Sequence, residues 1–334
     1  MKAMAVFNPG PIEQEPLRKV DVEPPEPGPG EILVRVKVCG VCRTDLHVAE
    51  GDLPVHKPRV IPGHEIVGVV ERLGPGADRY LPGMRVGIAW LRSTCGTCRW
   101  CTQGRENLCP EAKFTGYDED GGYGEYAVVR QDFAYRLPDA LDDREAAPLL
   151  CAGIIGFRAL KRAQVRPGCT LGLYGFGGSA HIAIQVAKYW GCRVFVMSRG
   201  ERHRELARAM GADWIGTAAD KPPSSLDAAI LFAPVGELVP PALEALAPAG
   251  ILAIAGIHLT DVPPLNYTRH LFFEKELRSV TANTRADAEE FLALAAKIPI
   301  RTQTMAFPLE QANQALRMLK TDQIKGAAVL DVAC

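Results

Sequence analysis

The stretch that restricts the fold of this chain most is a strand, a glycine-rich turn and a helix in immediate succession. Residues 170–180 read TLGLYGFGGSA and lead into an apolar run over 182–190. Strand, turn, helix and the next apolar strand, 193–197, occupy about 30 residues, which is the size of a βαβ unit. Because such a unit joins two parallel strands, the chain is expected to contain a parallel sheet.

The turn of this unit has the spacing G-x-G-x-x-A, which is typical of a loop that binds the pyrophosphate of a dinucleotide. Gly175 permits a tight turn, Gly177 lets the backbone approach the phosphates, and the small Ala180 allows close packing of the helix. Gly178 belongs to the same predicted loop, whose free N–H groups would face the phosphates. The alternative interpretation is a strand-to-helix turn that binds no ligand.

Alternating strands and helices after residue 170 predict an α/β domain with a doubly wound parallel sheet. Its candidate strands are 171–174, 193–197, 228–232, 251–255 and 277–281. Before it, up to about Pro138, short runs such as 31–38 and 66–72 predict strands joined by irregular loops. After it, helices near 286–297 and 309–321 and an apolar segment, 327–332, are expected to return to the first domain.

Length and charge limit the kind of protein that this chain can be. A chain of 334 residues exceeds what one hydrophobic core usually supports, so two domains are expected. The 38 basic and 39 acidic residues nearly cancel, which argues against a nucleic-acid partner and favours small ligands. Short apolar stretches and the absence of a signal pattern in residues 1–10 predict a cytoplasmic protein without membrane contact. In such a protein, ten cysteines indicate metal binding or catalysis rather than disulfides.

Four of these cysteines form a compact C-x2-C-x2-C-x7-C motif: Cys95, Cys98, Cys101 and Cys109. Four thiolates this close in the chain can surround one ion tetrahedrally, and zinc is its natural occupant. A site with four protein ligands is closed to substrate, so this zinc is expected to be structural. An iron–sulfur cluster is an alternative that the long last gap and the missing C-P sequence disfavour, and four unrelated core cysteines are a weaker one.

A second group of possible metal ligands is dispersed along the chain. Catalytic zinc requires three protein ligands and an open position, which mixed cysteine and histidine sets provide. The candidates are Cys42 in CGVCRTDLH, His64 in GHEIVG and Cys151 in LLCAG. Each alone is weak evidence, because a single histidine is usually an ordinary polar residue and Cys151 lies in an apolar run. Periodicity does not bring the three into one site.

In this order, with the four-cysteine motif between the second and the third, these segments resemble the medium-chain zinc-dependent alcohol dehydrogenases over nearly the whole chain. The resemblance implies a GroES-like β-barrel catalytic domain over 1–152, a Rossmann domain that binds NAD(P) over 153–283, and a return of 284–334 to the catalytic domain. It also implies reversible hydride transfer between an alcohol and an aldehyde or ketone. Two zinc ions per chain are expected, one catalytic and one structural.

The resemblance also gives roles to the dispersed residues. Cys42, His64 and Cys151 match the ligands of the catalytic zinc, whose open position lowers the pKa of a bound alcohol. Glu65 matches an acidic neighbour that approaches the metal as ligands exchange. Asp45 matches the carboxylate that orients the ligating imidazole.

A proton must leave the site when an alcohol is oxidised, and the resemblance implies a route from the Thr44 hydroxyl through the cofactor ribose to His47. Histidine suits the end of such a route because the side chain titrates near neutrality. Arg43, beside Thr44, is expected to bind the cofactor. The alternative is that Thr44 and His47 are ordinary turn residues.

The substrate is expected to be a simple alcohol or aldehyde. Trp90 matches an aromatic position of the substrate pocket, and Phe114 and Tyr117 are candidates for the same pocket or for ordinary core. Polyol dehydrogenases, the first alternative, typically place glutamate where Cys151 stands. The ligand set argues against a zinc-free quinone reductase and against a binding protein without turnover. Such relatives are commonly homodimers or homotetramers, and a tetramer is expected by analogy.

The end of the second strand of the dinucleotide domain predicts a preference for NADP(H) over NAD(H). An NAD site usually carries an acidic residue there, about 20 residues after the glycines, to bind the ribose 2′-hydroxyl. This chain has Ser198 and Arg199 instead, which can donate hydrogen bonds to a 2′-phosphate. Glu201 is the first carboxylate, and NAD binding remains the alternative if it reaches the ribose.

Overall fold

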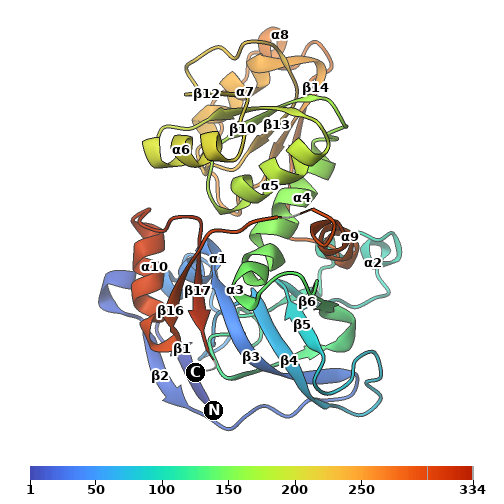
Figure 1. The fold of residues 1–334 in the computed structure, drawn as a ribbon, viewed down its shortest axis with the longest axis vertical. Helices are drawn as coiled ribbons and strands as arrows, with labels where there is room; N and C mark the ends of the chain where they lie inside the picture. The colour runs from blue at the N-terminus through green and yellow to red at the C-terminus, as the bar shows by residue number, and fades with distance from the viewer. Residues whose placement is uncertain (299, 333–334) are drawn as a thin grey trace. The chain divides into compact units, whose positions relative to one another are not determined.

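The computed structural model describes residues 1–298 and 300–332 and divides into two compact units (Figure 1). Unit 1 comprises Met1–Cys151 and the residues from Ala282 onward, and unit 2 comprises Ala152–Thr281. None of the helices within the described residues has both the length and the apolar composition needed to cross a membrane.

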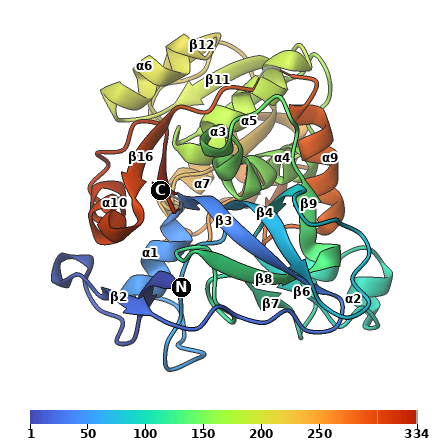
Figure 2. The same ribbon diagram turned by 60° about the horizontal axis from the view of Figure 1, so that its bottom comes forward.

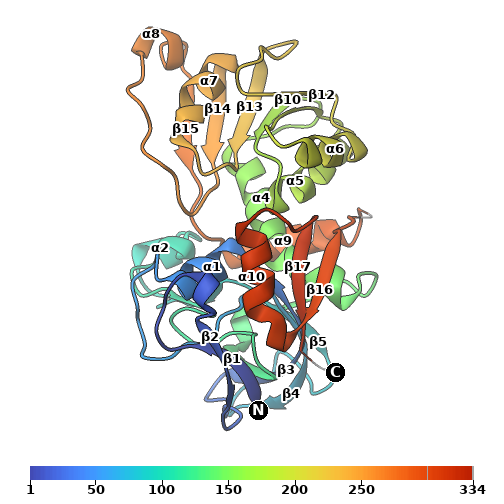
Figure 3. The ribbon, with the colours of Figure 1, turned by 90° about the vertical axis from the view of Figure 1, so that its left-hand side faces the viewer.

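Unit 2 contains a six-stranded sheet in which all strands are parallel. Its strand order is β12-β11-β10-β13-β14-β15, the order of a dinucleotide-binding fold, with β10 and β13 on either side of the point where the winding reverses (Figure 3). The strands are β10 (Thr170–Tyr174), β11 (Arg193–Met197), β12 (Trp214–Gly216), β13 (Leu226–Leu231), β14 (Leu246–Ile254) and β15 (Glu276–Ser279). The helices are α4 (Ala152–Arg162), α5 (Gly178–Tyr189), α6 (Glu201–Ala209), α7 (Val239–Ala245) and α8 (Tyr267–His270), with a 3₁₀ turn at Gly236–Leu238.

Both faces of this sheet are buried, which is why its strands are almost continuously apolar. Tyr174, Leu231 and Leu252 point to the face covered by α7, where they pack with Ala242 and Leu243. Successive residues of a strand point to opposite faces, so the alternate residues, such as the fully buried Leu171, Leu173 and Ile230, point to the other face. Parallel strands with helices on both faces confirm the predicted doubly wound α/β fold.

Unit 1 is built mainly from antiparallel strands (Figure 2). The strands are β1 (Lys2–Val6), β2 (Leu17–Asp21), β3 (Glu31–Val41), β4 (Ile66–Leu73), β5 (Arg85–Ile88), β6 (Leu91–Ser93), β7 (Lys113–Phe114), β8 (Tyr126–Arg130), β9 (Ala134–Arg136), β16 (Thr304–Pro308) and β17 (Ala327–Asp331). The helices are α1 (Arg43–Glu50), α2 (Arg99–Thr102), α3 (Asp143–Ala146), α9 (Arg285–Ala295) and α10 (Ala312–Lys320). Short 3₁₀ turns occupy Ile12–Gln14, Glu106–Leu108, Gln131–Phe133, Ala147–Leu150 and Leu309–Gln311.

The long strand β3 organises unit 1, because it pairs with β4, β8 and β17. Its pairing with β17 joins the C-terminal segment to the N-terminal part of the chain. Its pairing with β4 ends with Cys39 opposite Ile66, and the Gly40 N–H donates to the Glu65 carbonyl over 2.9 Å. The end of β3 and the start of β4 therefore lie side by side, and the chain segments at these two ends build the first site.

The structure differs from the sequence expectations mainly at short strands. The predicted strand 193–197 matches β11, whereas β13 and β14 begin earlier than expected, at Leu226 and Leu246. After residue 170, two strands were not predicted: β12, which has three residues, and β16, whose residues are mostly exposed or half-buried. The helix expected over 309–321 is a 3₁₀ turn followed by α10.

Candidate metal centres and dinucleotide site

Four side chains of unit 1 bring potential metal ligands together. They are Cys42, His64, Glu65 and Cys151, whose ligand atoms all lie within 4.8 Å of one another. Cys42 precedes α1, His64 and Glu65 precede β4, and Cys151 follows the 3₁₀ turn Ala147–Leu150. The Sγ atoms of Cys42 and Cys151 are 3.8 Å apart. Cys39, the other cysteine of the CGVC segment, is fully buried and lies outside this group.

Asp45 fixes the orientation of the His64 imidazole. Its Oδ1 lies 2.9 Å from Nδ1 of His64, and both side chains are buried. The same carboxylate accepts the backbone N–H of Cys42 over 2.9 Å and that of Gly63 over 3.1 Å, so it also caps the start of α1. Tyr123 donates its hydroxyl to Oδ2 over 3.3 Å. Asp45 therefore ties two of the dispersed segments together.

The other ring nitrogen of His64 has no hydrogen-bond partner among the described residues, although it is buried. Buried polar nitrogens are rarely left unpaired, so an unpaired one beside two thiols requires an explanation. A histidine whose Nδ1 is held by a carboxylate while Nε2 faces two cysteine sulfurs has the arrangement of a zinc ligand. Two thiols and one imidazole form a donor set that fits zinc and leaves one position open.

The electrostatics of this group also favour a cation. The Cys151 thiol next to it lowers the pKa of Cys42, and the same contact raises the pKa of Cys151. Burial raises the pKa of Glu65 well above its usual range. Burial opposes protonation of His64, but the Asp45 carboxylate outweighs burial and raises the pKa of the imidazole. In a buried site, several acidic groups cannot all be ionised without a compensating positive charge. One divalent ion would supply that charge and stabilise the thiolates.

The second group of ligands is the four-cysteine motif, in the lobe between β6 and β7. The sulfur atoms of Cys95, Cys98, Cys101 and Cys109 lie within 4.8 Å of one another. Backbone N–H groups of Cys98 and Thr97 point at Cys95 and lower its pKa to about 6, whereas burial raises the pKa of Cys109 to about 11. Four converging sulfurs can surround one zinc ion tetrahedrally, which would leave no ligand position for substrate.

The three aromatic residues expected in the substrate pocket form one stack beside His64. The Trp90 ring stands edge-on to His64, with 5.0 Å between ring centroids. Phe114 and Tyr117 lie nearly parallel to Trp90, at centroid distances of 4.9 and 6.0 Å. All three belong to unit 1, so the part of the metal site nearest Trp90 has an aromatic wall.

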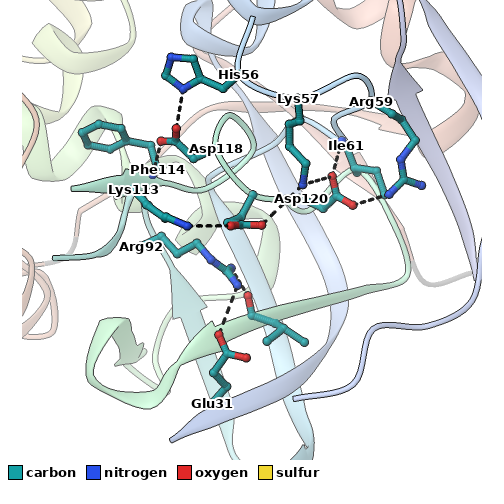
Figure 4. Close-up of polar contacts among 12 residues, drawn as sticks. Glu31, His56, Lys57, Arg59, Ile61, Arg92, Lys113, Phe114, Asp118 and Asp120 are labelled. Atoms are coloured by element: carbon teal, nitrogen blue, oxygen red, sulfur yellow. Dashed lines mark hydrogen bonds and ion pairs between the residues drawn. The ribbon is translucent and has the colours of Figure 1, made fainter. Parts of the chain in front are cut away.

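Charged side chains join the loop that carries Phe114 and Tyr117 to residues 56–61 (Figure 4). His56 Nδ1 lies 2.6 Å from Asp118, whose other oxygen accepts the Phe114 N–H over 2.8 Å. Asp120 accepts hydrogen bonds from Arg59 over 2.7 Å and from the Ile61 N–H over 3.1 Å. These contacts hold the segment that leads into His64 against the segment that follows Phe114.

The residues of α1 lie directly after the first metal site. Thr44 is buried, and its Oγ1 is 3.9 Å from the Cys42 sulfur. His47, one helical turn later, is partly exposed and its Nδ1 lies 2.7 Å from Asp52. Arg43 is exposed and donates to the Leu319 carbonyl over 3.5 Å.

The predicted dinucleotide loop joins β10 to α5 in unit 2. Gly175 has φ +88°, and a Cβ there would lie 2.9 Å from the backbone N of Ala233, so only glycine fits. A Cβ on Gly177 would meet nothing within 4 Å, which leaves open space beside the backbone. Gly178 starts α5, and Ala180 is fully buried. This loop has the clearance that a phosphate group requires at a helix N-terminus.

The end of β11 carries the residues predicted to select the cofactor. Ser198 is nearly buried, and its N–H donates to the Gly216 carbonyl over 2.9 Å, while Arg199 is exposed. Glu201 lies 3.4 Å from Arg204, one helical turn away. The first carboxylate after the strand is therefore engaged within its own helix.

Sequence reasoning missed Tyr123, because nothing in the surrounding GGYG indicates that its hydroxyl reaches Asp45. It also missed the pair His56 and Asp118, which are far apart in the chain. No short motif encodes either contact.

Comparison with known proteins gives matches over most of the chain. The family model of the alcohol dehydrogenase GroES-like domain matches residues 28–139, and that of the zinc-binding dehydrogenases matches residues 178–297. A probable alcohol dehydrogenase of Mycobacterium tuberculosis is 57% identical over 99% of this chain and 97% of its own length. An alcohol dehydrogenase of Geobacillus stearothermophilus is 38% identical over 96% of this chain and 98% of its own. The solved structure of a cobalt- and zinc-bound thermostable alcohol dehydrogenase from Pyrobaculum aerophilum superposes with a TM-score of 0.89, 29% identity and 99% coverage of both chains.

Proposed function

The chain belongs to the zinc-dependent medium-chain alcohol dehydrogenase family, and from this premise we propose that it interconverts simple alcohols with aldehydes or ketones, using NADP(H) and a zinc ion held by Cys42, His64 and Cys151. The fold of unit 1 is then the GroES-like catalytic domain of the family, and that of unit 2 is its Rossmann domain. A second zinc ion, held by the four-cysteine lobe, stabilises the catalytic domain.

The observation that carries this proposal is the unpaired, buried Nε2 of His64 within ligand distance of two cysteine sulfurs. A catalytic role requires that one position around the ion be open to substrate, and Cys42, His64 and Cys151 fill three positions of a tetrahedron. Glu65, the fourth member of the group, is buried, and burial raises the pKa of its carboxyl well above the usual range.

When bound, zinc supplies a Lewis acid that lowers the pKa of the substrate alcohol, and the nicotinamide accepts the hydride. The side chains of the protein prepare the site for this chemistry. Asp45 holds the imidazole so that Nε2 is the ligating nitrogen. The stack of Trp90, Phe114 and Tyr117 excludes water on one side, which strengthens electrostatic interactions in the site.

We propose that the proton leaves by way of Thr44 and His47. The Thr44 hydroxyl, beside the Cys42 sulfur, would receive it from the alcohol, the cofactor ribose would link the two side chains when bound, and His47 would deliver it to solvent. Because Nδ1 of His47 is engaged by Asp52, Nε2 is the nitrogen that exchanges the proton. Arg43, exposed at the start of the same helix, supplies a positive charge for a phosphate of the cofactor.

The chain functions as a homo-oligomer in the cytoplasm under this proposal, most simply a tetramer. Large apolar side chains are exposed on unit 2 within a short stretch of chain that includes the edge strand β15, and a surface of this kind is typical of an interface. They are Ile257, Tyr267, Phe272, Phe273 and Leu277.

The test combines metal analysis with initial rates over a panel of primary and secondary alcohols, polyols, aldehydes and quinones, with both nicotinamide cofactors. We expect two zinc ions per chain and turnover with simple alcohols and aldehydes. Cys151→Ala should abolish turnover in a folded protein, whereas Cys39→Ala, a buried cysteine outside the ligand group, should retain it. Full activity of Cys151→Ala, or a preference for polyols or quinones, would contradict the proposal.

A further inference from the structure

Two cysteines of unit 2 form a thiol pair that the proposed function does not use. Of the nine described cysteines, six belong to the two ligand groups and Cys39 is buried apart from them. The remaining two, Cys169 and Cys192, have Sγ atoms 3.7 Å apart. Cys192 is 2% exposed, while Cys169 is partly exposed and reachable from solvent.

The backbone around each thiol is fixed by a separate local structure. Cys169 ends the turn Arg166–Pro167–Gly168–Cys169, closed by a hydrogen bond of 3.2 Å from the Cys169 N–H to the Arg166 carbonyl. Proline at the second position and Gly168 with φ +79° at the third are typical of a type II turn. This turn sets the position of Cys169 directly before β10.

Cys192 is held by the end of helix α5. Gly191, with φ +73°, donates to the Lys188 carbonyl over 2.9 Å, and Cys192 donates to the Ala187 carbonyl over 3.0 Å. These two hydrogen bonds form a Schellman motif, which ends the helix and directs the chain into β11.

A third hydrogen bond links the two segments, from the Arg193 N–H to the Cys169 carbonyl over 3.0 Å. The register pairs Thr170 with Arg193, so Cys169 and Cys192 continue the same parallel pairing by one residue. Neighbouring strands are about 4.8 Å apart, which lies within the Cα separation that a disulfide spans. Bond formation therefore requires rotation of the two side chains rather than movement of the backbone.

The geometry points to Cys169 and Cys192 as a site of reversible covalent modification, at which a hydroperoxide or a small disulfide such as oxidised glutathione converts the two thiols into one disulfide. With a hydroperoxide, the Cys169 thiolate attacks one oxygen, the O–O bond breaks, and an alcohol or water leaves as a sulfenic acid forms. The Cys192 sulfur then attacks the Cys169 sulfur, and water leaves as the S–S bond forms. The two thiols lose two electrons and two protons in total, and the hydroperoxide gains them.

The position of the pair determines what the modification changes. Cys169 and Cys192 lie before the amino ends of β10 and β11, whereas Gly175 follows the carboxyl end of β10. Strand β10 has five residues, about 16 Å of extended chain. The disulfide would tie the first βαβ unit together without touching the dinucleotide loop. Burial raises the pKa of the Cys169 thiol to about 12, so the reaction should speed up as pH rises.

The test uses the full-length, zinc-loaded protein treated with hydrogen peroxide at pH 7 and pH 9, followed by peptide mapping without reduction. We expect a cross-linked peptide that joins Cys169 to Cys192, formed faster at pH 9 and lost after treatment with dithiothreitol. The midpoint of thermal unfolding should rise by about 5 °C, since the bond constrains the unfolded chain. The dissociation constant of NADPH should change less than twofold.

Cys192→Ser is the matched control, because it keeps the turn at Cys169 and removes only the second sulfur. It should show neither the cross-link nor the rise in unfolding temperature. The inference is wrong if both thiols of the wild-type protein stay free to alkylation, or if Cys169 is oxidised to a sulfinic acid while Cys192 stays free. It is also wrong if affinity for NADPH falls in step with cross-linking. Because the cross-link is measured by mass, this result is separate from whether the protein turns over alcohols.

Discussion

The imidazole of His64 and the carboxylate of Asp45 form a buried pair, with Nδ1 of the ring 2.9 Å from Oδ1 of the carboxylate. Asp45 lies in the first turn of α1 and His64 lies directly before β4, so the pair joins two segments that are not adjacent in the sequence. The carboxylate fixes the tautomer and makes Nε2 a stronger donor to a metal ion.

Asp45→Asn should weaken zinc binding at the first site by roughly 10- to 100-fold, because the amide cannot supply the negative charge that supports the imidazole. The amide oxygen can still accept the Cys42 N–H, so the fold should persist. Competition with a chelator, followed by zinc release, measures the affinity. The exposed Asp21→Asn serves as control. Equal zinc retention in the two variants would show that Asp45 is only a helix cap.

Cys98→Ala should remove one zinc ion per chain and lower the midpoint of thermal unfolding by several degrees, while molecules that remain folded keep turnover. Binding energy at a closed site supports folding rather than chemistry. Zinc analysis, calorimetry and rates per folded molecule check this, with Cys39→Ala as a cysteine control outside both groups. A variant that loses all turnover but unfolds at the wild-type temperature would reverse the assignment of the lobe.

Protonation of His181 should destabilise the protein in acid. Burial lowers its pKa to about 4, and both ring nitrogens lack a partner among the described residues. The unfolded chain, with a histidine pKa of about 6.5, therefore binds the proton first as the pH falls. The contribution of neutral His181 to the free energy of unfolding is fully present above about pH 6.5. It is lost progressively as the pH falls to about 4, and the loss is about 3 kcal/mol at most.

Urea unfolding between pH 4 and pH 8 measures this loss. His181→Leu should unfold with a weaker pH dependence in that window, whereas His258→Leu, at an exposed position of the same unit, should behave like the wild type. The interpretation fails if the wild type and His181→Leu lose stability in parallel.

The fold was largely predictable because its signals are local and periodic. Strand β11 was predicted with its exact residues, since an apolar run between a helix and a charged segment has few alternatives. Strand β12 was missed because three residues are too few to show a period, and its place at the sheet edge is set by pairing with β11.

The candidate sites also differ in how far local sequence signals could predict them. The four-cysteine lobe could be proposed from spacing alone, because all of its sulfurs come from one stretch of chain. Cys42, His64 and Cys151 come from three segments, so spacing could not join them and a family resemblance was needed. The contact of Tyr123 with Asp45 joins residues that are 78 positions apart. The Cys169–Cys192 pair depends on the register of β10 and β11, which the sequence does not state.

His47→Gln should slow alcohol oxidation most at the lower end of the active pH range, where solvent offers few other bases. Glutamine keeps a polar side chain on α1 but cannot take up a proton near neutral pH. Asp52→Asn is the matched control, because it alters the partner of Nδ1 and leaves the imidazole in place. A pH–rate profile that the substitution of His47 leaves unaltered would place the exit of the proton elsewhere.

The preference between NADP and NAD depends on charge at the end of β11. An acidic side chain at this position would repel a 2′-phosphate, and here the strand is followed by Ser198 and the exposed Arg199. NAD binding would be favoured if Glu201 reached the ribose. Glu201 instead lies 3.4 Å from Arg204, whose positive charge attracts it.

The ratio of kcat/KM for NADP to kcat/KM for NAD should therefore exceed one, and Arg199→Ala should lower it. Loss of a charge-assisted hydrogen bond to phosphate should lower kcat/KM for NADP by roughly tenfold or more. It should hardly change kcat/KM for NAD, which has no 2′-phosphate. Ser198→Asp should shift the ratio further in the same direction, because a carboxylate there can accept the 2′-hydroxyl of NAD and repels the phosphate of NADP. If the wild type prefers NAD, or if the ratio is the same with and without Arg199, this segment does not select the cofactor by recognising the 2′-phosphate.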